Sequence, residues 1–210
     1  NSLDTKNSEI LEDIEREALA DNVPIIRREM QSFLKVLLMV KKPMRVLEVG
    51  TAVGFSALLM SEYVPEECAI TTIENYEKRI PIARQNFVRA GKEKKITLLE
   101  GDAMDVLKTL EGPYDFIFMD AAKGQYIHYL PEILRLLAKG GILVSDNVMQ
   151  DGDVIESRFA VERRDRTIHA RMREYLYELK HNDALVTSII PLGDGVALSV
   201  KKEVGTDIAQ

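Results

Sequence analysis

The sequence contains one cysteine, no tryptophan and no apolar run long enough to cross a bilayer. The single cysteine, Cys68, cannot form an internal disulfide, which is typical of a protein kept in a reducing cytoplasm. The first residues also lack the basic segment followed by an apolar one that marks a secretory signal. We therefore expect a cytoplasmic protein without a membrane partner.

The composition is that of an ordinary globular protein. Hydrophobic residues make up 46% and charged residues 30% of the 210 positions, and a chain of this length supports one substantial core. No repeat or linker is visible, so we expect a single domain over 1–210, with N-terminal helices in 1–42 and the main core in 43–210. The net charge of −6 argues against non-specific coating of nucleic acid but does not exclude a local basic patch.

Apolar periodicity predicts two helices followed by strands and helices in alternation. The first helix is expected at Ser8–Ala20, and a second opens at Pro24 and stops before Pro43. The alternating elements that follow are expected at 45–49, 54–63, 69–74, 77–90, 96–100, 103–110, 114–120, 126–138 and 141–146. Such alternation predicts an α/β fold with a doubly wound, mostly parallel sheet and helices on both faces.

The C-terminal part breaks this alternation. A helix is expected at 165–180, followed by strands at 185–190 and 196–200. Gly193-Asp194-Gly195 between the two strands is a hairpin signal, so the last strand should be antiparallel to its neighbour.

Two predicted strands end on polar side chains. Asp120 follows one buried apolar run, and Asp146 and Asn147 follow another. Because carboxyl ends of parallel strands meet at one edge of a sheet, where open α/β sheets bind ligands, these three side chains should converge. Two carboxylates and one amide oxygen suit Mg²⁺. Lys123, three residues beyond Asp120, would lie close by.

The loop after the first strand has the character of a nucleoside site. Gly50 and Gly54 allow a tight turn, but their spacing is not that of a pyrophosphate loop. Glu74, at the end of the second strand, can hold ribose hydroxyls. Glu48 beside the loop opposes a phosphate and suits a sulfonium or amino group, which favours S-adenosylmethionine over a dinucleotide. Asp102 is placed where it would border an adenine ring.

Each of these residues also has an ordinary structural explanation. The glycines could form a plain strand-to-helix turn, and Glu74 could cap the next helix. Asp102 is a plausible N-cap, Asp146 and Asn147 could form a turn, and Lys123 could be solvated. Together these explanations require several strand ends to be polar by accident on one edge, which favours a functional site.

The combination resembles the cation-dependent O-methyltransferases, which include catechol and caffeoyl-CoA O-methyltransferases. The residues that carry the resemblance are Glu48-x-Gly50-Thr-x-x-Gly54-Phe-Ser56, Glu74, Gly101-Asp102-Ala103, Asp120-Ala-x-Lys123 and Asp146-Asn147. The resemblance implies a Rossmann-like class I methyltransferase sheet of seven strands, whose last, antiparallel strand inserts between two parallel ones. It also implies a homodimer, with the N-terminal helices as the contact surface.

The resemblance further assigns roles to individual residues. It implies metal ligands at Asp120, Asp146 and Asn147, for Mg²⁺ or another divalent cation, and a general base at Lys123. It implies S-adenosylmethionine contacts at Ile26, Glu48, Gly50, Ser56, Glu74, Ala103 and Asp120.

A closer similarity is to the bacterial branch that methylates 5-hydroxyuridine in tRNA. It is carried by 22–25, 120–126, 146–148 and 190–195. Plant members carry an acid, and the catechol enzyme a tryptophan, where Ala122 stands. Because this chain has no tryptophan, the aromatic gate of a catechol site is absent.

An arginine-rich stretch bears on the substrate. Its members are Arg158, Arg163, Arg164, Arg166, Arg171 and Arg173. It is either a solvated face or a patch that contacts the phosphates of a tRNA anticodon loop. Tyr126 and Tyr129 could stack on a splayed base or lie in the core.

Three functions therefore stay open. The first is a tRNA wobble-uridine O-methyltransferase, and the second acts on a small catechol or phenol. Both substrates offer two adjacent oxygens to a cation that lowers the pKa of the attacking hydroxyl, so the metal does not separate them. The third is a nucleotide-binding oxidoreductase or a non-catalytic binding module, against which Glu48 and the glycine spacing argue.

Overall fold

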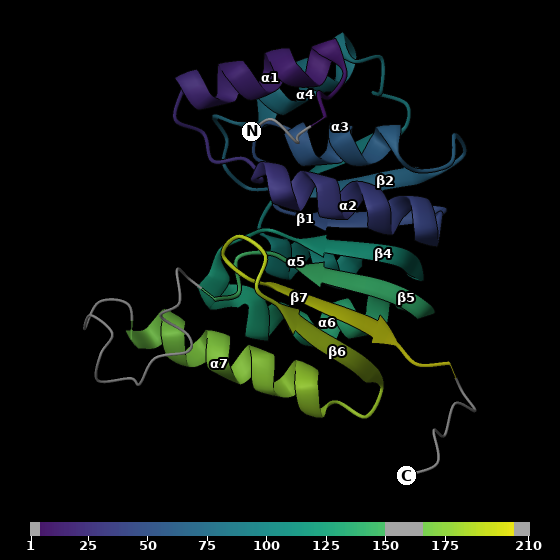
Figure 1. Ribbon diagram of the computed structural model, residues 1–210, viewed down its shortest axis with the longest axis vertical. Coiled ribbons are helices and arrows are strands. Elements are labelled where there is room, and N and C mark those ends of the chain that lie inside the picture. Colours follow the sequence, from purple (N-terminus) through teal and green to yellow (C-terminus); the bar gives the residue numbers. More distant parts are fainter. Residues whose placement is uncertain (1–4, 150–165, 204–210) are drawn as a thin grey trace. The chain divides into compact units, whose positions relative to one another are not determined.

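The computed structural model describes residues 5–149 and 166–203 (Figure 1). Contacts within the chain group it into two compact units, residues 1–106 and 107–210. Across the described ranges, none of the helices has the length and apolar character that a membrane crossing needs.

Unit 1 (1–106) contains three parallel strands in the order β3-β2-β1. These are β1 (Arg45–Val49), β2 (Ala69–Glu74) and β3 (Ile96–Glu100), with the bounds expected from the sequence. Helix α3 (Phe55–Glu62) connects β1 to β2, and α4 (Ile80–Arg89) connects β2 to β3. All residues of β1 after Arg45 are buried, as expected of a parallel strand covered on both faces.

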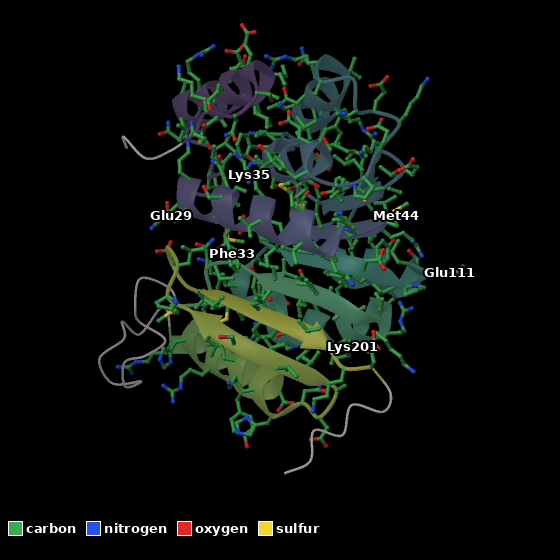
Figure 2. The ribbon with its side chains drawn as sticks, turned by 45° about the vertical axis from the view of Figure 1, so that its right-hand side comes forward. Glu29, Phe33, Lys35, Met44, Glu111 and Lys201 are labelled. Carbon is green, nitrogen blue, oxygen red and sulfur yellow. The ribbon has the colours of Figure 1, made fainter. Side chains whose placement is uncertain are left out.

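Two N-terminal helices belong to the same unit. Helix α1 (Glu9–Ala20) buries Leu11 and Ile14, and α2 (Arg28–Lys41) buries Leu34 and Leu38. Both helices pack against α3. Lys35 and Phe33 leave α2 on opposite sides (Figure 2), and Lys35 donates to the side chain of Asn7 (2.6 Å).

The prediction that the second helix opens at Pro24 is wrong. The Val23 amide donates to the Ala18 carbonyl (2.8 Å), which closes the end of α1. Ile26 is buried, and its carbonyl accepts a hydrogen bond from Gln31 Nε2 (3.0 Å). These contacts fix the connection in a non-helical course, so the helix begins at Arg28.

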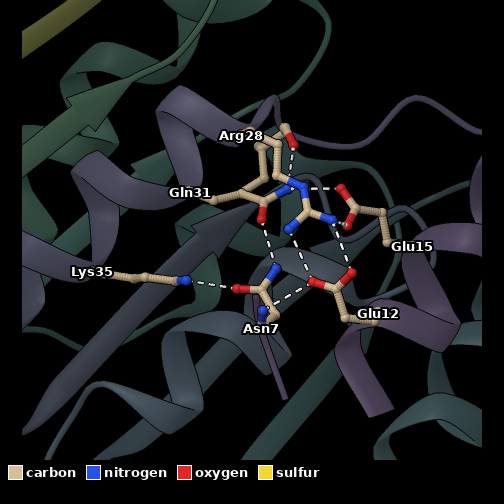
Figure 3. A network of polar contacts seen from close by, with 7 residues as sticks. Asn7, Glu12, Glu15, Arg28, Gln31 and Lys35 are labelled. Carbon is tan, nitrogen blue, oxygen red and sulfur yellow. Dashed lines mark hydrogen bonds and ion pairs between the residues drawn. The ribbon is translucent and has the colours of Figure 1, made fainter. Parts of the chain in front are cut away.

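A polar network joins α1 to α2 (Figure 3). Arg28 donates through Nη1 and Nη2 to the two carboxylate oxygens of Glu12 (2.9 and 3.1 Å) and also bonds Glu15, which accepts from Gln31 (3.1 Å). The hydrogen bond from Arg28 lowers the pKa of Glu12 to about 2. Because this pKa lies below its ordinary value, the pair stabilises the fold at neutral pH, and the contribution is lost as pH falls towards about 2.

Unit 2 (107–210) contains four strands in the order β4-β5-β7-β6. These are β4 (Tyr114–Met119), β5 (Leu137–Ser145), β6 (Leu185–Ile190) and β7 (Val196–Lys201). Strands β4 and β5 are parallel, and β7 is antiparallel to both of its neighbours. The last strand therefore lies between β5 and β6, as the family resemblance implies.

The helices of unit 2 cover and connect these strands. A short 3-10 helix, η1 (Lys123–Gln125), leads into α6 (Tyr126–Leu136), and α7 (Arg166–His181) contacts α6, η1 and β6 (Figure 1). Helix α5 (Ala103–Thr109) spans the residues at which the two units meet in sequence.

The predicted boundary between α6 and β5 is wrong. The helix ends at Leu136, and Leu137 already pairs with Tyr114, four residues before the expected start of the strand. A tight bend follows, in which Gly140 has a φ of 67° and a Cβ on Gly141 would meet the Ala138 carbonyl at 2.7 Å. This bend accommodates the register shift between β4 and β5.

Candidate functional site

The glycine loop of unit 1 lies between β1 and α3. Gly50 and Gly54 have φ values of 103° and 85°, a region that side chains disfavour. A Cβ on Gly54 would also lie 2.5 Å from Phe87 Cε1. The backbone therefore explains both glycines without a ligand, and their predicted cofactor contacts stay predictions.

Glu48 is wholly buried beneath this loop. Its carboxylate accepts hydrogen bonds from Ser56 Oγ and Thr72 Oγ1, each at 2.5 Å, and Thr72 Oγ1 lies 2.5 Å from Thr51 Oγ1. These bonds tie β1, β2 and the start of α3 together. Sequence reasoning missed both threonines, although Thr72 is a polar residue inside an apolar strand. The contacts of Glu48 and Ser56 with a cofactor stay predictions.

Glu74 ends β2 and reaches back to the glycine loop. Its Oε2 accepts from the Ala52 amide (2.7 Å), and its Oε1 accepts from the amides of Asn75 and Tyr76 (3.1 and 2.9 Å). A carboxylate has about four acceptor positions, so one remains for a ligand hydroxyl. The same bonds hold the chain in a turn, which explains why α4 begins at Ile80 and not at the predicted Glu77.

The other predicted cofactor residues of unit 1 also have structural roles. Asp102 Oδ1 accepts from the Met104 amide (2.8 Å), so the N-cap interpretation is confirmed. Ala103 opens α5, and Ile26, in the connection from α1 to α2, is buried. Contacts of these three residues with a cofactor stay predictions.

In unit 2, the structure brings the three predicted metal ligands together. Asp120 follows β4, and Asp146 and Asn147 follow β5. The Asp146 amide donates to the Met119 carbonyl (2.9 Å), which joins the two strand ends. Asn147 donates through Nδ2 to Asp120 Oδ1 (3.4 Å) and through its backbone amide to Asp146 Oδ1 (2.8 Å). Whether they bind a metal stays a prediction, as does the cofactor contact of Asp120.

The electrostatics of this cluster fit a divalent cation. Burial raises the pKa of Asp120 against the opposing charge of Lys123. Burial, followed by the charge of Asp120, raises the pKa of Asp146 to about 7. Two neighbouring carboxylates that resist ionisation, Asp146 buried and Asp120 half-buried, gain from a bound cation, and oxygen ligands suit Mg²⁺. Within 5–149 and 166–203 no group of three or more His, Cys, Asp or Glu residues could hold a metal, so the amide of Asn147 is needed to complete the set.

Lys123 opens η1 beside this cluster and is half-buried. Its positive charge acts on both carboxylates in the direction that lowers their pKa. Arg171 of α7 donates through Nη1 to the carbonyl of the next residue, Gly124 (3.2 Å), and so fixes the segment that carries Lys123.

The arginine-rich stretch is only partly described. Arg158, Arg163 and Arg164 lie outside the described residues, whereas Arg166, Arg171 and Arg173 lie on α7. One member, Arg171, contacts the protein's own backbone. The expected phosphate contacts of the stretch stay a prediction.

The suggestion that Tyr126 and Tyr129 stack on a base is wrong. Tyr126 is 0% and Tyr129 5% exposed, so the core alternative holds for both residues. They share the face of α6 that packs into unit 2, and burial raises the pKa of Tyr126 well above its usual range.

The whole chain can be compared with known proteins. A family profile described as O-methyltransferase matches residues 1–202. This chain belongs to the O-methyltransferase family. It is 35% identical over 128 residues to a catechol O-methyltransferase of Niastella koreensis, in a match covering 59% of this chain and 58% of that protein. It is 33% identical over 183 residues to caffeoyl-CoA O-methyltransferase 2 of Populus trichocarpa, covering 79% and 70%.

A solved structure extends the similarity over nearly the whole chain. The SAH-bound methyltransferase PaMTH1 of Podospora anserina superposes with a TM-score of 0.87 and 27% identity, covering 96% of this chain and 92% of that one. The expected Rossmann-like methyltransferase fold is thereby confirmed. The matched region spans somewhat more than half the length of the Niastella enzyme.

Proposed function

We propose that this protein is an S-adenosylmethionine- and Mg²⁺-dependent O-methyltransferase that converts 5-hydroxyuridine at the tRNA wobble position to 5-methoxyuridine. The observation that carries the proposal is the cluster of Asp120, Asp146 and Asn147 at two strand ends, with Lys123 beside it. A role as a plain dinucleotide-binding protein would not require such an oxygen-rich cluster.

S-adenosylmethionine is supported by the family and by the SAH-bound Podospora relative. In unit 1, Glu74 has an acceptor position left for a ribose hydroxyl, and the turn at Gly50 and Gly54 allows close approach to backbone amides. Asp102 and Ala103 would border the adenine, as predicted.

The oxygen cluster supplies the means to activate a hydroxyl. Asp120, Asp146 and Asn147 would hold a divalent cation, which lowers the pKa of a substrate hydroxyl when bound. Lys123 would accept the hydroxyl proton through Nζ as general base. Since η1 is fixed to α7 through Arg171, Lys123 is presented from a supported segment.

The catechol and caffeoyl-CoA relatives keep a small phenolic substrate as the alternative. The arginine-rich stretch and the absence of tryptophan favour the tRNA anticodon loop. A tRNA substrate and the single cysteine both support a proposed cytoplasmic location.

The substrate proposal is tested by mass spectrometry of tRNA nucleosides from cells that lack this protein. We expect 5-methoxyuridine to disappear, 5-hydroxyuridine to accumulate, and expression of the wild-type chain to reverse both changes. Unchanged 5-methoxyuridine in the deletion would refute the tRNA assignment and favour the phenolic alternative.

Replacement of Glu74 by alanine should weaken S-adenosylmethionine binding. The one charge-assisted hydrogen bond that Glu74 can still accept from a ribose hydroxyl is worth about 1.5–3 kcal/mol, and the loop also loses its tie at Ala52. Glu100→Ala is the matched control, because Glu100 lies opposite Glu74 on β3 and pairs with Arg84 at the surface. Calorimetry showing equal affinity for both variants and the wild type would remove Glu74 from the cofactor site.

Neutralising Arg163, Arg164 and Arg166 together should weaken tRNA binding and spare any activity on a small catechol. Each lost phosphate contact on single-stranded RNA should reduce the slope of log affinity against log salt by about 0.7. Wild-type affinity with an unchanged salt slope would show that the stretch is a solvated face.

A control for this variant removes the same charge elsewhere. Three exposed lysines outside the arginine-rich stretch serve this purpose: Lys94, Lys108 and Lys139. Their replacement by glutamine should leave the salt slope nearly unchanged.

We also propose a homodimer formed through α2. Val36, Met39 and Val40 are 62%, 60% and 77% exposed and share one face of the helix, where a second copy would bury them. Light scattering should find a dimer that Val36→Lys with Val40→Lys converts to a monomer. A monomeric wild-type protein would exclude this assembly.

A further inference from the structure

Tyr126 places a buried hydroxyl between the ends of β4 and β5. The Ala121 amide donates to Tyr126 Oη (3.2 Å), and Oη lies 3.1 Å from the Met119 carbonyl and 3.2 Å from the Asp146 carbonyl. Since a phenol has one proton, the two carbonyls share it as acceptors. A single side-chain atom therefore contacts three backbone groups from two strand ends.

These backbone groups lie within or directly beside the oxygen cluster of Asp120, Asp146 and Asn147. Met119 and Ala121 flank Asp120, and the third group is the carbonyl of Asp146 itself. The Asp146 amide also donates to the Met119 carbonyl (2.9 Å), so Tyr126 Oη completes a closed set of contacts around the strand ends. The spacing between the two carboxylate-bearing residues is fixed at their backbone.

The ring of Tyr126 is itself held by a second tyrosine. Tyr175 of α7 packs edge-on against it, with centroids 5.4 Å apart and planes at 75°. The Tyr175 hydroxyl lies 2.6 Å from Oγ of Ser145, the residue before Asp146. Both rings are wholly buried, so neither hydroxyl can exchange its contacts for water.

We propose that Tyr126 is a positioning residue that holds Asp120 and Asp146 at the spacing a divalent cation needs, without touching cation or substrate. The inference rests on the proposed cation site. Some residues contact the metal ligands without touching the metal. Removing such a residue typically changes metal affinity by about tenfold to a hundredfold.

The test is calorimetric titration of Mn²⁺ into the full chain and into Tyr126→Phe, which keeps the ring and removes the hydroxyl. We expect the cation dissociation constant to rise about tenfold or more while S-adenosylmethionine affinity stays unchanged. Tyr175→Phe is the matched control, because it also loses a buried hydroxyl but one bonded to a side chain. We expect it to bind Mn²⁺ nearly as the wild type does.

The outcomes separate the inference from the proposed function. A folded Tyr126→Phe with wild-type Mn²⁺ affinity, or an equal loss in both variants, would overturn the positioning role and leave the cation site standing. A wild-type chain that binds no Mn²⁺ would overturn both.

Amide exchange in the cation-free wild-type chain gives a second test that needs no variant. We expect the Ala121 amide, which donates to Tyr126 Oη, to exchange far more slowly than that of its exposed neighbour Ala122. Equal exchange at Ala121 and Ala122 would show that the contacts of Tyr126 Oη are not formed before the cation binds, and would overturn the inference.

Discussion

Asp146→Ala should reduce methyl transfer by about a thousandfold or more, and Asp120→Ala should do the same. Each variant removes one of only two carboxylates in the cluster, and a cation in such a site supplies several kcal/mol of transition-state stabilisation. Initial rates at saturating Mg²⁺ and cofactor measure the effect. Asp183→Ala, in the exposed turn before β6, is the matched control and should retain wild-type rates.

The stability of Asp146→Ala separates lost chemistry from lost folding. The pKa of Asp146 is raised to about 7, so the folded state favours the protonated form. Stability contributed by such a group is present below its unfolded pKa and is lost as pH rises through the folded value. Above about pH 7 and without a cation, the variant should therefore be at least as stable as the wild type. A large drop in its melting temperature there would mean that the lost activity reflects lost folding. Full wild-type activity after treatment with a chelator would contradict the metal assignment.

Lys123→Met should slow the chemical step by about a hundredfold to ten-thousandfold while S-adenosylmethionine affinity stays unchanged. The reason is that a free phenol ionises near pH ~10, so the hydroxyl needs a nearby base at neutral pH. Raising the pH should partly restore the rate, because the substrate then ionises unaided. Single-turnover rates measure the step, and Lys139→Met, on an exposed lysine, serves as the control.

A different outcome for Lys123→Met would assign the residue another role. If cofactor affinity fell together with the rate and high pH restored nothing, Lys123 would hold the cluster together electrostatically. Its charge does act on both carboxylates, so this alternative has a basis in the structure.

Several strands were predictable because their apolar runs are local features of the sequence. β1, β2, β3 and β6 have the expected bounds, each being a short apolar run closed by polar or turn residues. The starts of α2 and α4 were not predictable, because they depend on side-chain hydrogen bonds that apolar periodicity does not reveal. Gln31 holds the Ile26 carbonyl, and Glu74 holds the two amides that follow it.

The candidate site likewise combines features that the sequence pattern reveals with features that it does not. That Asp120, Asp146 and Asn147 would meet followed from one rule, that carboxyl ends of parallel strands share an edge. The burial of Tyr126 could not be derived, since it depends on how α6 is rotated against the sheet. The hydrogen bonds of Glu48 with Ser56 and Thr72 likewise join separate segments, and the polar Thr72 within an apolar strand indicated a buried contact but not its partner.

Cation-dependent methyl transfer to a tRNA hydroxyl is tested most directly by one assay. The purified chain is incubated with methyl-labelled S-adenosylmethionine and tRNA from cells lacking the protein, once with Mg²⁺ and once with a chelator. We expect label in 5-methoxyuridine at the wobble position in the presence of Mg²⁺ and none with the chelator. Equal labelling under both conditions, or no labelling of tRNA under either, would contradict it.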